Sequence, residues 1–260
     1  NFRCFRELEI PTLERVNLIT GMNNVGKTAL LEALFVHIGR NNPELTTRIT
    51  GFRGIERFAL APEEIWGWLF CEKNVEQAIE LSAVDDKNVG RNLTIRLVAP
   101  REPEQLPLSD AEGKIAVSTK TTAAALRQLE LVYHDSVGES GTSRAVITPE
   151  GPKMIRAQFA PFPLGAFLST RHRFPQEDAD RFSSLERIRR QDEVLKILQI
   201  LEPRLRRLSV LITGGVPMVN ADLGIGELVP IPIAGEGMGR LLSMVLSILS
   251  MKSGFVLVDE

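Results

Sequence analysis

The segment that most constrains the fold is the glycine-rich run at residues 21–28, Gly-Met-Asn-Asn-Val-Gly-Lys-Thr, which fits the pattern G-x-x-x-x-G-K-[ST]. An apolar segment, 16–20, precedes this run, and an Ala- and Leu-rich segment, 27–38, follows it and ends at Gly39. We expect a strand over 16–20 and a helix over 27–38. A strand, a glycine-rich loop and a helix in this order predict a phosphate-binding loop, or P-loop.

The residue types of this loop suit the phosphates of ATP. Glycines allow the backbone to curl so that its N–H groups surround phosphate oxygens, and the helix N-terminus adds partial positive charge. Lys27 would hold the β- and γ-phosphate oxygens, and the Thr28 hydroxyl would bind Mg²⁺. The predicted ATP-binding residues are Gly21, Asn23, Asn24, Val25, Gly26, Lys27, Thr28 and Ala29.

A second motif lies at residues 254–260, Gly-Phe-Val-Leu-Val-Asp-Glu, where an apolar strand would deliver two carboxylates at its C-terminal end. We expect Asp259 to hold Mg²⁺ together with Thr28, and Glu260 to act as the general base on the attacking water. Lys27 and Asp259 stand near opposite ends of the chain, and no Asn-Lys-x-Asp follows. Both features argue against a small GTPase.

A third motif, Gly235-Glu-Gly-Met-Gly-Arg240, precedes an apolar helix predicted over 241–251. A helix N-terminus with a glycine-rich lead-in favours anions. We expect this segment to contact the γ-phosphate of ATP bound to another copy of the chain.

The opening Asn-Phe-Arg-Cys-Phe-Arg, the P-loop and the late Gly-Glu-Gly-Met-Gly-Arg…Val-Leu-Val-Asp-Glu resemble the ABC-class ATPase heads of the SMC, RecF and OLD group, within the compact AAA-type branch without a long coiled coil. The resemblance covers about residues 1–40 and 165–260. It implies an α/β fold: a P-loop NTPase core of ABC-ATPase type with an antiparallel β-subdomain and a helical signature lobe. It also implies a homodimer or higher homo-oligomer that sandwiches ATP and Mg²⁺ between one P-loop and the opposite signature, Gly235, Gly237 and Arg240.

Three features depart from that family pattern. Gly235 stands where many relatives have Ser, so one hydroxyl contact to the γ-phosphate is missing. Gln158 and Gln176 are both candidates for the glutamine loop. The switch histidine and the D-loop should follow Glu260, so we expect the chain to be part of a longer protein, and we interpret His37, His134 and His172 as ordinary core or surface residues.

The remaining sequence predicts one ATPase head over residues 1–260, with a β-hairpin or arm insertion over 41–165 and a helical lobe over 175–207. A capping box, Ser183 with Glu186, predicts the start of a helix. Further helices are expected at 121–128 and 241–251, and a loop at 100–115. Strands are expected at 5–10, 78–83, 93–99, 129–134, 144–148, 208–213, 216–221, 227–233 and 255–258.

Composition indicates a soluble globular protein, because 43% of the residues are hydrophobic and 25% are charged. Only two cysteines, Cys4 and Cys71, are present, which suggests a reducing compartment, the cytoplasm. The apolar stretch 241–258 contains Lys252, so we favour a buried helix and strand over a membrane span.

The net charge of −2 gives no global preference for nucleic acid. A local group of arginines could still contact a phosphate backbone. The alternative, which we favour, is a solvated face balanced by Glu186, Asp192, Glu193 and Glu202. The arginines are Arg171, Arg173, Arg181, Arg187, Arg189, Arg190, Arg204, Arg206 and Arg207.

The expected function is therefore ATP binding and hydrolysis that drives head dimerisation, in DNA repair or anti-phage defence by family analogy. The alternative is a nucleotide-gated scaffold with negligible turnover that holds an effector such as a nuclease or toxin. The missing hydroxyl at Gly235 favours the scaffold slightly. A membrane-transporter subunit is disfavoured by the N-terminal sequence and by the separation of the two phosphate motifs.

Overall fold

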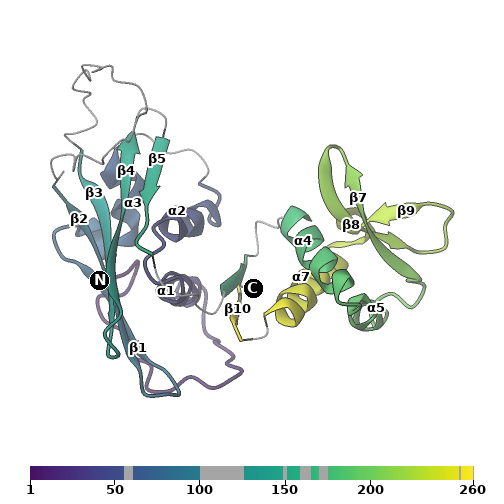
Figure 1. The fold of residues 1–260 in the computed structure, drawn as a ribbon, viewed down its shortest axis with the longest axis horizontal. Helices are drawn as coiled ribbons and strands as arrows, with labels where there is room; N and C mark the ends of the chain where they lie inside the picture. The colour runs from purple at the N-terminus through teal and green to yellow at the C-terminus, as the bar shows by residue number, and fades with distance from the viewer. Residues whose placement is uncertain are drawn as a thin grey trace, which may run out of the picture. The chain divides into compact units, whose positions relative to one another are not determined.

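The computed structural model describes residues 1–55, 61–99, 126–148, 151–158, 165–169, 175–251 and 253–259. These residues form two compact units, Asn1–Phe162 and Pro163–Glu260 (Figure 1). The first unit contains the P-loop, and the second contains the signature segment and Asp259.

Unit 1 is built on a five-stranded antiparallel sheet in the order β1-β2-β3-β4-β5. Alternate residues of the central strands point to one face, as the period of a strand requires. The register aligns Ile79, Ile95 and Leu131 in one row, and all three are fully buried. The strands are β1 (Ile79–Val84), β2 (Gly90–Val98), β3 (Gln128–Asp135), β4 (Ser140–Thr148) and β5 (Gly151–Ile155).

Helices cover the apolar face of this sheet (Figure 1). Helix α1 is apolar around most of its circumference, as expected of a helix enclosed by other elements. Trp66, which is fully buried at the end of α3, also belongs to this core. The helical segments are α1 (Lys27–Ile38), α2 (Glu44–Gly51), α3 (Pro62–Trp66), η1 (Gly67–Leu69) and η2 (Cys71–Lys73).

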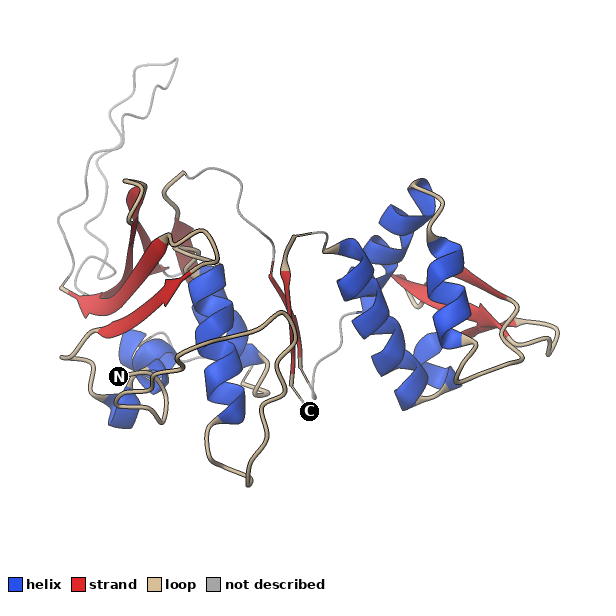
Figure 2. Cartoon of the chain, turned by 90° about the horizontal axis from the view of Figure 1, so that it is seen from below, coloured by secondary structure: helices blue, strands red, loops and turns tan. Residues whose placement is uncertain are grey.

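Unit 2 packs helices on one side of a three-stranded sheet, β7-β8-β9 (Figures 1 and 2). Its core is apolar and includes Phe182, Leu198, Val219 and Leu246. A separate parallel pair, β6 and β10, belongs to the same unit. The strands are β6 (Gly165–Leu168), β7 (Arg207–Thr213), β8 (Val216–Asp222), β9 (Leu228–Pro230) and β10 (Phe255–Val258). The helices are α4 (Pro175–Arg187), α5 (Gln191–Leu198), α6 (Ile231–Ala234) and α7 (Glu236–Ser250).

The two strands predicted before the P-loop, 5–10 and 16–20, are wrong. Neither segment is a strand, and Phe5 makes only an isolated bridge with Phe2. Val16 and Leu18 are 86% and 89% exposed. A strand needs a neighbour to satisfy its N–H and C=O groups, and among the described residues no strand pairs with 5–10 or 16–20.

Three boundaries in unit 2 also differ from the sequence-based prediction. Ser183 does not cap a helix, because α4 has already begun at Pro175. The strand predicted over 227–233 ends at Pro230, and the chain becomes helical at Ile231. The last helix begins at Glu236 rather than at residue 241.

The remaining predicted elements fall into two groups. The helix over 27–38 is confirmed, and so are the strands near 78–83, 93–99, 129–134, 144–148, 208–213, 216–221 and 255–258, within four residues at each end. The loop predicted over 100–115 and most of the helix predicted over 121–128 lie outside the described residues, although Gln128 begins β3. The predicted mixed α/β class with an antiparallel sheet is confirmed.

The division into units does not test the prediction of a single head with an insertion at 41–165 and a lobe at 175–207, which stays a prediction.

Among the described residues, no helix is long and apolar enough to cross a membrane.

Candidate functional site

The P-loop adopts a tight curl that Lys27 closes. Its ammonium group donates hydrogen bonds to the carbonyl oxygens of Gly21 and Met22, both at 2.7 Å. Gly21, Asn24 and Gly26 have φ values of 152°, 67° and 99°, a region that favours glycine and tolerates asparagine. The lysine is therefore held over the loop, where an incoming phosphate would compete with the two carbonyls for its protons.

Gly26 is required by packing as well as by backbone conformation. A Cβ atom at this position would lie 2.5 Å from Cζ of Phe5 and 2.7 Å from Sγ of Cys4. The N-terminal segment thus lies directly against the end of the loop. No sequence pattern predicts this contact, because segments about twenty residues apart meet here.

Helix α1 begins immediately after the loop, with the Leu30 amide bonded to the Gly26 carbonyl at 2.9 Å. Lys27 and Thr28 are partly exposed, whereas Ala29 is buried and faces the core. Ala29 could therefore contribute only its backbone N–H to a phosphate. The residues predicted to face the phosphates, Gly21, Asn23, Asn24 and Val25, are exposed.

A buried carboxylate holds α1 in place one turn beyond Thr28. Glu32 is fully buried and forms ion pairs with Arg3, at 2.9 Å, and with Arg53, at 2.7 Å. Arg3 also donates to the Trp68 carbonyl at 3.1 Å. Burial lowers the pKa of Arg3, and the Glu32 carboxylate opposes that shift. The first turns of α1 are thereby tied to three other segments of unit 1, a constraint that sequence analysis missed.

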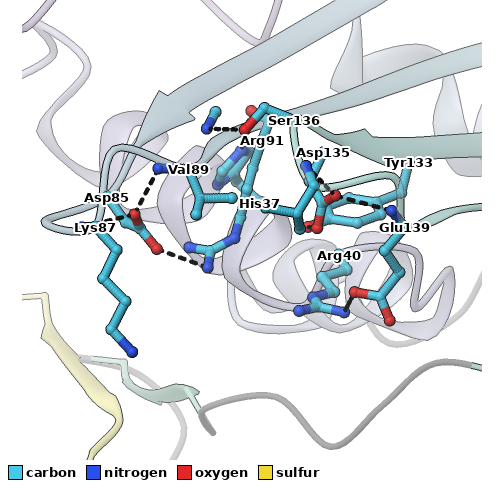
Figure 3. A network of polar contacts seen from close by, with 12 residues as sticks. His37, Arg40, Asp85, Lys87, Val89, Arg91, Tyr133, Asp135, Ser136 and Glu139 are labelled. Carbon is cyan, nitrogen blue, oxygen red and sulfur yellow. Dashed lines mark hydrogen bonds and ion pairs between the residues drawn. The ribbon is translucent and has the colours of Figure 1, made fainter.

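The other end of α1 is tied to the β3–β4 hairpin by Arg40, as Figure 3 shows. The Arg40 guanidinium pairs with Glu139 at 2.6 Å and lies 5.0 Å from the centre of the Tyr133 ring. The hairpin is itself shaped by Asp135, whose carboxylate accepts from the N–H groups of Val137 and Glu139.

His37 makes the corresponding contact with the β1–β2 hairpin (Figure 3). Its Nε2 lies 3.3 Å from the Arg91 carbonyl, and burial lowers the pKa of His37. Asp85, which pairs with Arg91 at 2.7 Å, accepts from the Val89 N–H, and that bond helps to hold the pKa of Asp85 below its ordinary value. His37 is thus a structural residue that links the P-loop helix to the sheet, as the sequence interpretation expected of an ordinary histidine.

The signature segment lies at the N-terminus of α7. Gly235 has φ 141° and ψ 149°, and no side-chain hydrogen bond caps the helix. A Cβ atom at Gly235 or at Gly237 would meet no heavy atom within 4 Å. Arg240 pairs with Glu236 one turn away, at 3.1 Å. The helix therefore presents uncapped backbone N–H groups beside open space.

Asp259 directly follows β10, and its backbone N–H donates to the Leu168 carbonyl at 2.9 Å. The parallel register of β10 with β6 ends both strands at one edge of the pair. Glu260 lies outside the described residues. Thr28 and Asp259, the two predicted Mg²⁺ ligands, belong to different units.

No group of three or more His, Cys, Asp or Glu side chains that could hold a metal ion occurs in the described part of the chain. A hydroxyl and a carboxylate are nevertheless oxygen donors of the kind that Mg²⁺ takes when phosphates and water complete its shell. The predicted pair, Thr28 and Asp259, fits Mg²⁺ in donor chemistry.

Several of the clustered arginines are paired with carboxylates. Arg181 pairs with Glu177, Arg190 with Glu193, and Arg204 with Glu202. The Arg206 side chain packs on the turn at Gly224, where a Cβ would lie 2.7 Å from its Cζ. These contacts match the favoured interpretation as a solvated face, and DNA contact stays a prediction. Arg171 and Arg173 lie outside the described residues.

Neither candidate for the glutamine loop is distinguished from the other by its burial. Gln158 and Gln176 are both exposed. His134 is exposed and contacts Asn92 at 3.2 Å, while His172 lies outside the described residues.

Comparison with known proteins adds a family and one relative. A model of the AAA domain family matches residues 1–208. The chain is similar to an ATP/GTP phosphatase of Helicobacter pylori (strain ATCC 700392 / 26695), with 21% identity over 281 residues that cover 100% of this chain and 73% of the relative. No solved structure matches significantly. The family match includes the P-loop, α1 and the whole five-stranded sheet.

Proposed function

The chain belongs to the AAA domain family and is a P-loop ATPase, and from this premise we propose that it hydrolyses ATP between two copies of itself. The P-loop of one copy would bind the phosphates, and the signature segment 235–240 of the other copy would complete the site. This arrangement corresponds to an ABC-ATPase type of core, and binding of ATP would therefore drive dimerisation or higher assembly.

The observation that carries this proposal is the open glycine start of α7. Glycine inside a helix destabilises it by roughly 0.5–1 kcal/mol relative to alanine. Within the described part of the chain, no contact explains Gly237, since its missing Cβ would meet nothing within 4 Å. Close approach of an external group explains it: a γ-phosphate could reach the helix N–H groups without a side chain in the way.

Hydrolysis needs a metal ion and a base in addition to the phosphate contacts. We assign Mg²⁺ to Thr28 and Asp259, where it would neutralise charge on the β- and γ-phosphates. We assign the role of general base to Glu260, which follows Asp259 directly.

The setting of this activity follows from the resemblance alone. We propose a role in DNA repair or anti-phage defence, in the cytoplasm, with an effector nuclease or toxin as a possible protein partner. Three arginines of unit 2 already pair with carboxylates, so they offer little support for DNA binding. The relative's name, ATP/GTP phosphatase, makes GTP a second nucleotide to test beside ATP.

Replacement of Gly237 with Glu tests the composite site. A carboxylate at this position should repel the γ-phosphate and abolish ATP-dependent assembly in light scattering, while nucleotide binding to the P-loop persists. Ile248→Glu adds the same charge at an exposed position of the same helix and should assemble normally. Intact ATP-dependent assembly of Gly237→Glu would contradict the composite site.

Replacement of Glu260 with Gln separates the ATPase from the scaffold alternative. Gln is nearly isosteric but cannot accept the proton of water, so steady-state turnover should fall by about 10²- to 10⁴-fold. Assembly in ATP should then last longer than in wild type. Glu227→Gln, at an exposed position, should leave turnover unchanged. If wild type turns over as slowly as Glu260→Gln, the protein is a nucleotide-held scaffold.

A further inference from the structure

The first turn of α7 has little local stability of its own. Gly235, Gly237 and Gly239 occupy alternate positions at its start, and glycine is the least favourable helix residue apart from proline. None of the described side chains caps this end with a hydrogen bond. The orientation of the signature segment must therefore come from a tertiary contact.

One such contact joins α7 to α4. The Ser243 hydroxyl lies 2.5 Å from Oδ2 of Asp178 and 3.1 Å from the carbonyl oxygen of Gly239. The Asp178 carboxylate and the Gly239 carbonyl both accept from this hydroxyl, so its single proton is shared between them. The Gly239 amide in turn donates to the Gly235 carbonyl at 3.1 Å. Asp178 is thereby linked through one serine to the first turn of α7.

Burial makes this contact costly to leave incomplete. Asp178 and Ser243 are only 8% and 7% exposed. An apolar pair would fill the same space without desolvating a carboxylate, so general packing does not explain the choice of residues. Asp178 stands in the first turn of α4, whose N-terminal dipole favours its negative charge, and Arg181 lies 3.5 Å from its other oxygen.

Hydrogen bonds differ from apolar contacts in being directional. Leu242 and Leu246 also bury α7 in the core of unit 2, but apolar packing tolerates small rotations of a helix about its axis. The bond from Ser243 to Asp178 fixes that rotation and the axial position close to the glycines.

We propose that Asp178, acting through Ser243, is a positioning residue for the signature segment: it holds the first turn of α7 in the orientation that receives the γ-phosphate of a nucleotide bound to a second copy. This inference rests on the proposed composite site. It assigns Asp178 no contact with ATP, so its loss should spare nucleotide binding to the P-loop of the same copy.

The test uses Asp178→Asn and Ser243→Ala in the full chain. Both variants should bind ATP with unchanged affinity but lose about tenfold in ATP-dependent assembly and turnover, the scale of one hydrogen bond to a charged group. Ser243→Thr, which keeps the hydroxyl, should recover most of the loss. Asp180→Asn and Ser184→Ala are matched controls on exposed positions of α4 and should behave as wild type.

Mixing separates a positioning defect from a folding defect. A mixture of Asp178→Asn with Lys27→Ala should regain turnover, because a mixed dimer contains one site with an intact P-loop and an intact signature. If Asp178→Asn were misfolded, it could not supply that P-loop and the mixture would stay inactive. An inactive mixture would therefore attribute the defect to folding and overturn the positioning role.

Two further outcomes distinguish this proposal from the composite site itself. If Gly237→Glu blocks assembly but Asp178→Asn and Ser243→Ala match wild type, the composite site stands and the positioning role is overturned. If wild type shows no ATP-dependent assembly, the composite site fails and the positioning role fails with it.

Discussion

Helices α1 and α7 each follow a glycine-rich segment, but different forces hold them. Near its start, α1 buries Glu32 between Arg3 and Arg53. Helix α7 buries Leu242 and Leu246 in an apolar cluster, and its Ser243 donates a buried hydrogen bond to the Asp178 carboxylate. The P-loop helix therefore combines apolar burial with paired charges, whereas the signature helix combines apolar burial with one directional contact.

The two helices should therefore differ in how well they tolerate amino-acid substitutions. A buried charge that loses its partner is strongly destabilising, whereas an apolar core loses stability in proportion to the atoms removed. We expect the P-loop end of unit 1 to tolerate few substitutions. The signature end of unit 2 should keep its fold through many apolar exchanges but lose orientation when the bond to Asp178 is removed.

The largest expected effect is on the affinity for ATP, which should depend on the P-loop of the same copy and not on its signature segment. Lys27→Ala removes the charge that the P-loop places among the phosphates, and the affinity for ATP should fall by about 100-fold or more, as expected for the loss of charged hydrogen bonds. Isothermal titration calorimetry measures this change. Lys87→Ala, at an exposed turn of unit 1, should bind normally. Unchanged affinity of Lys27→Ala would contradict the P-loop assignment.

The second effect concerns the anchor of α1. Glu32→Gln leaves Arg3 and Arg53 without their buried countercharge, which should lower the free energy of unfolding by about 3–5 kcal/mol. Urea denaturation followed by circular dichroism measures it. The control Glu64→Gln changes an exposed carboxylate and should shift stability by no more than about 0.5 kcal/mol. Equal stability of the two variants would remove the contrast between the helices.

The third effect concerns the anchor of α7. Leu246 is fully buried in unit 2, and Leu246→Ala should destabilise by about 2–5 kcal/mol through lost apolar burial and a cavity. Ile248, on the same helix, is 61% exposed, so Ile248→Ala serves as the control and should be nearly neutral. The same denaturation series compares both helices directly. A neutral Leu246→Ala would mean that apolar packing does not hold α7.

The smallest effect is the pH dependence that His37 adds to unit 1. Because burial places its pKa below the ordinary value of 6.5, the unfolded chain binds the proton more readily than the folded one. The stability that neutral His37 contributes to the folded state is fully present above pH 6.5. It is lost as the pH falls toward the lowered pKa, with a slope of at most about 1.4 kcal/mol per pH unit.

Denaturation midpoints between pH 7.5 and 5 measure the slope of this pH dependence. His37→Gln should reduce it, whereas His134→Gln, which changes an exposed histidine, should keep it. An unchanged slope in His37→Gln would show that other groups carry the pH dependence.

Local sequence patterns are enough to predict the P-loop, helix α1 and most strands of the β-sheet. These features depend on local patterns: the spacing of Gly21, Gly26 and Lys27, alternating apolar residues, and glycine-rich turns. The family match and the register of the five-stranded sheet agree with them. The segment 16–20 shows the limit of local pattern, since an apolar run becomes a strand only where a neighbouring strand accepts its hydrogen bonds.

The contacts that hold the two glycine-rich segments, in contrast, join distant parts of the chain and appear only once it is folded. Glu32 meets Arg3 and Arg53, and Asp178 meets Ser243, across separations in sequence that no periodicity encodes. A charged residue in an amphipathic pattern is predicted to be exposed, because burial of a charge is unfavourable until a specific partner offsets its cost. Which partner arrives is a property of the folded chain, so the buried charges that position this site became visible only in three dimensions.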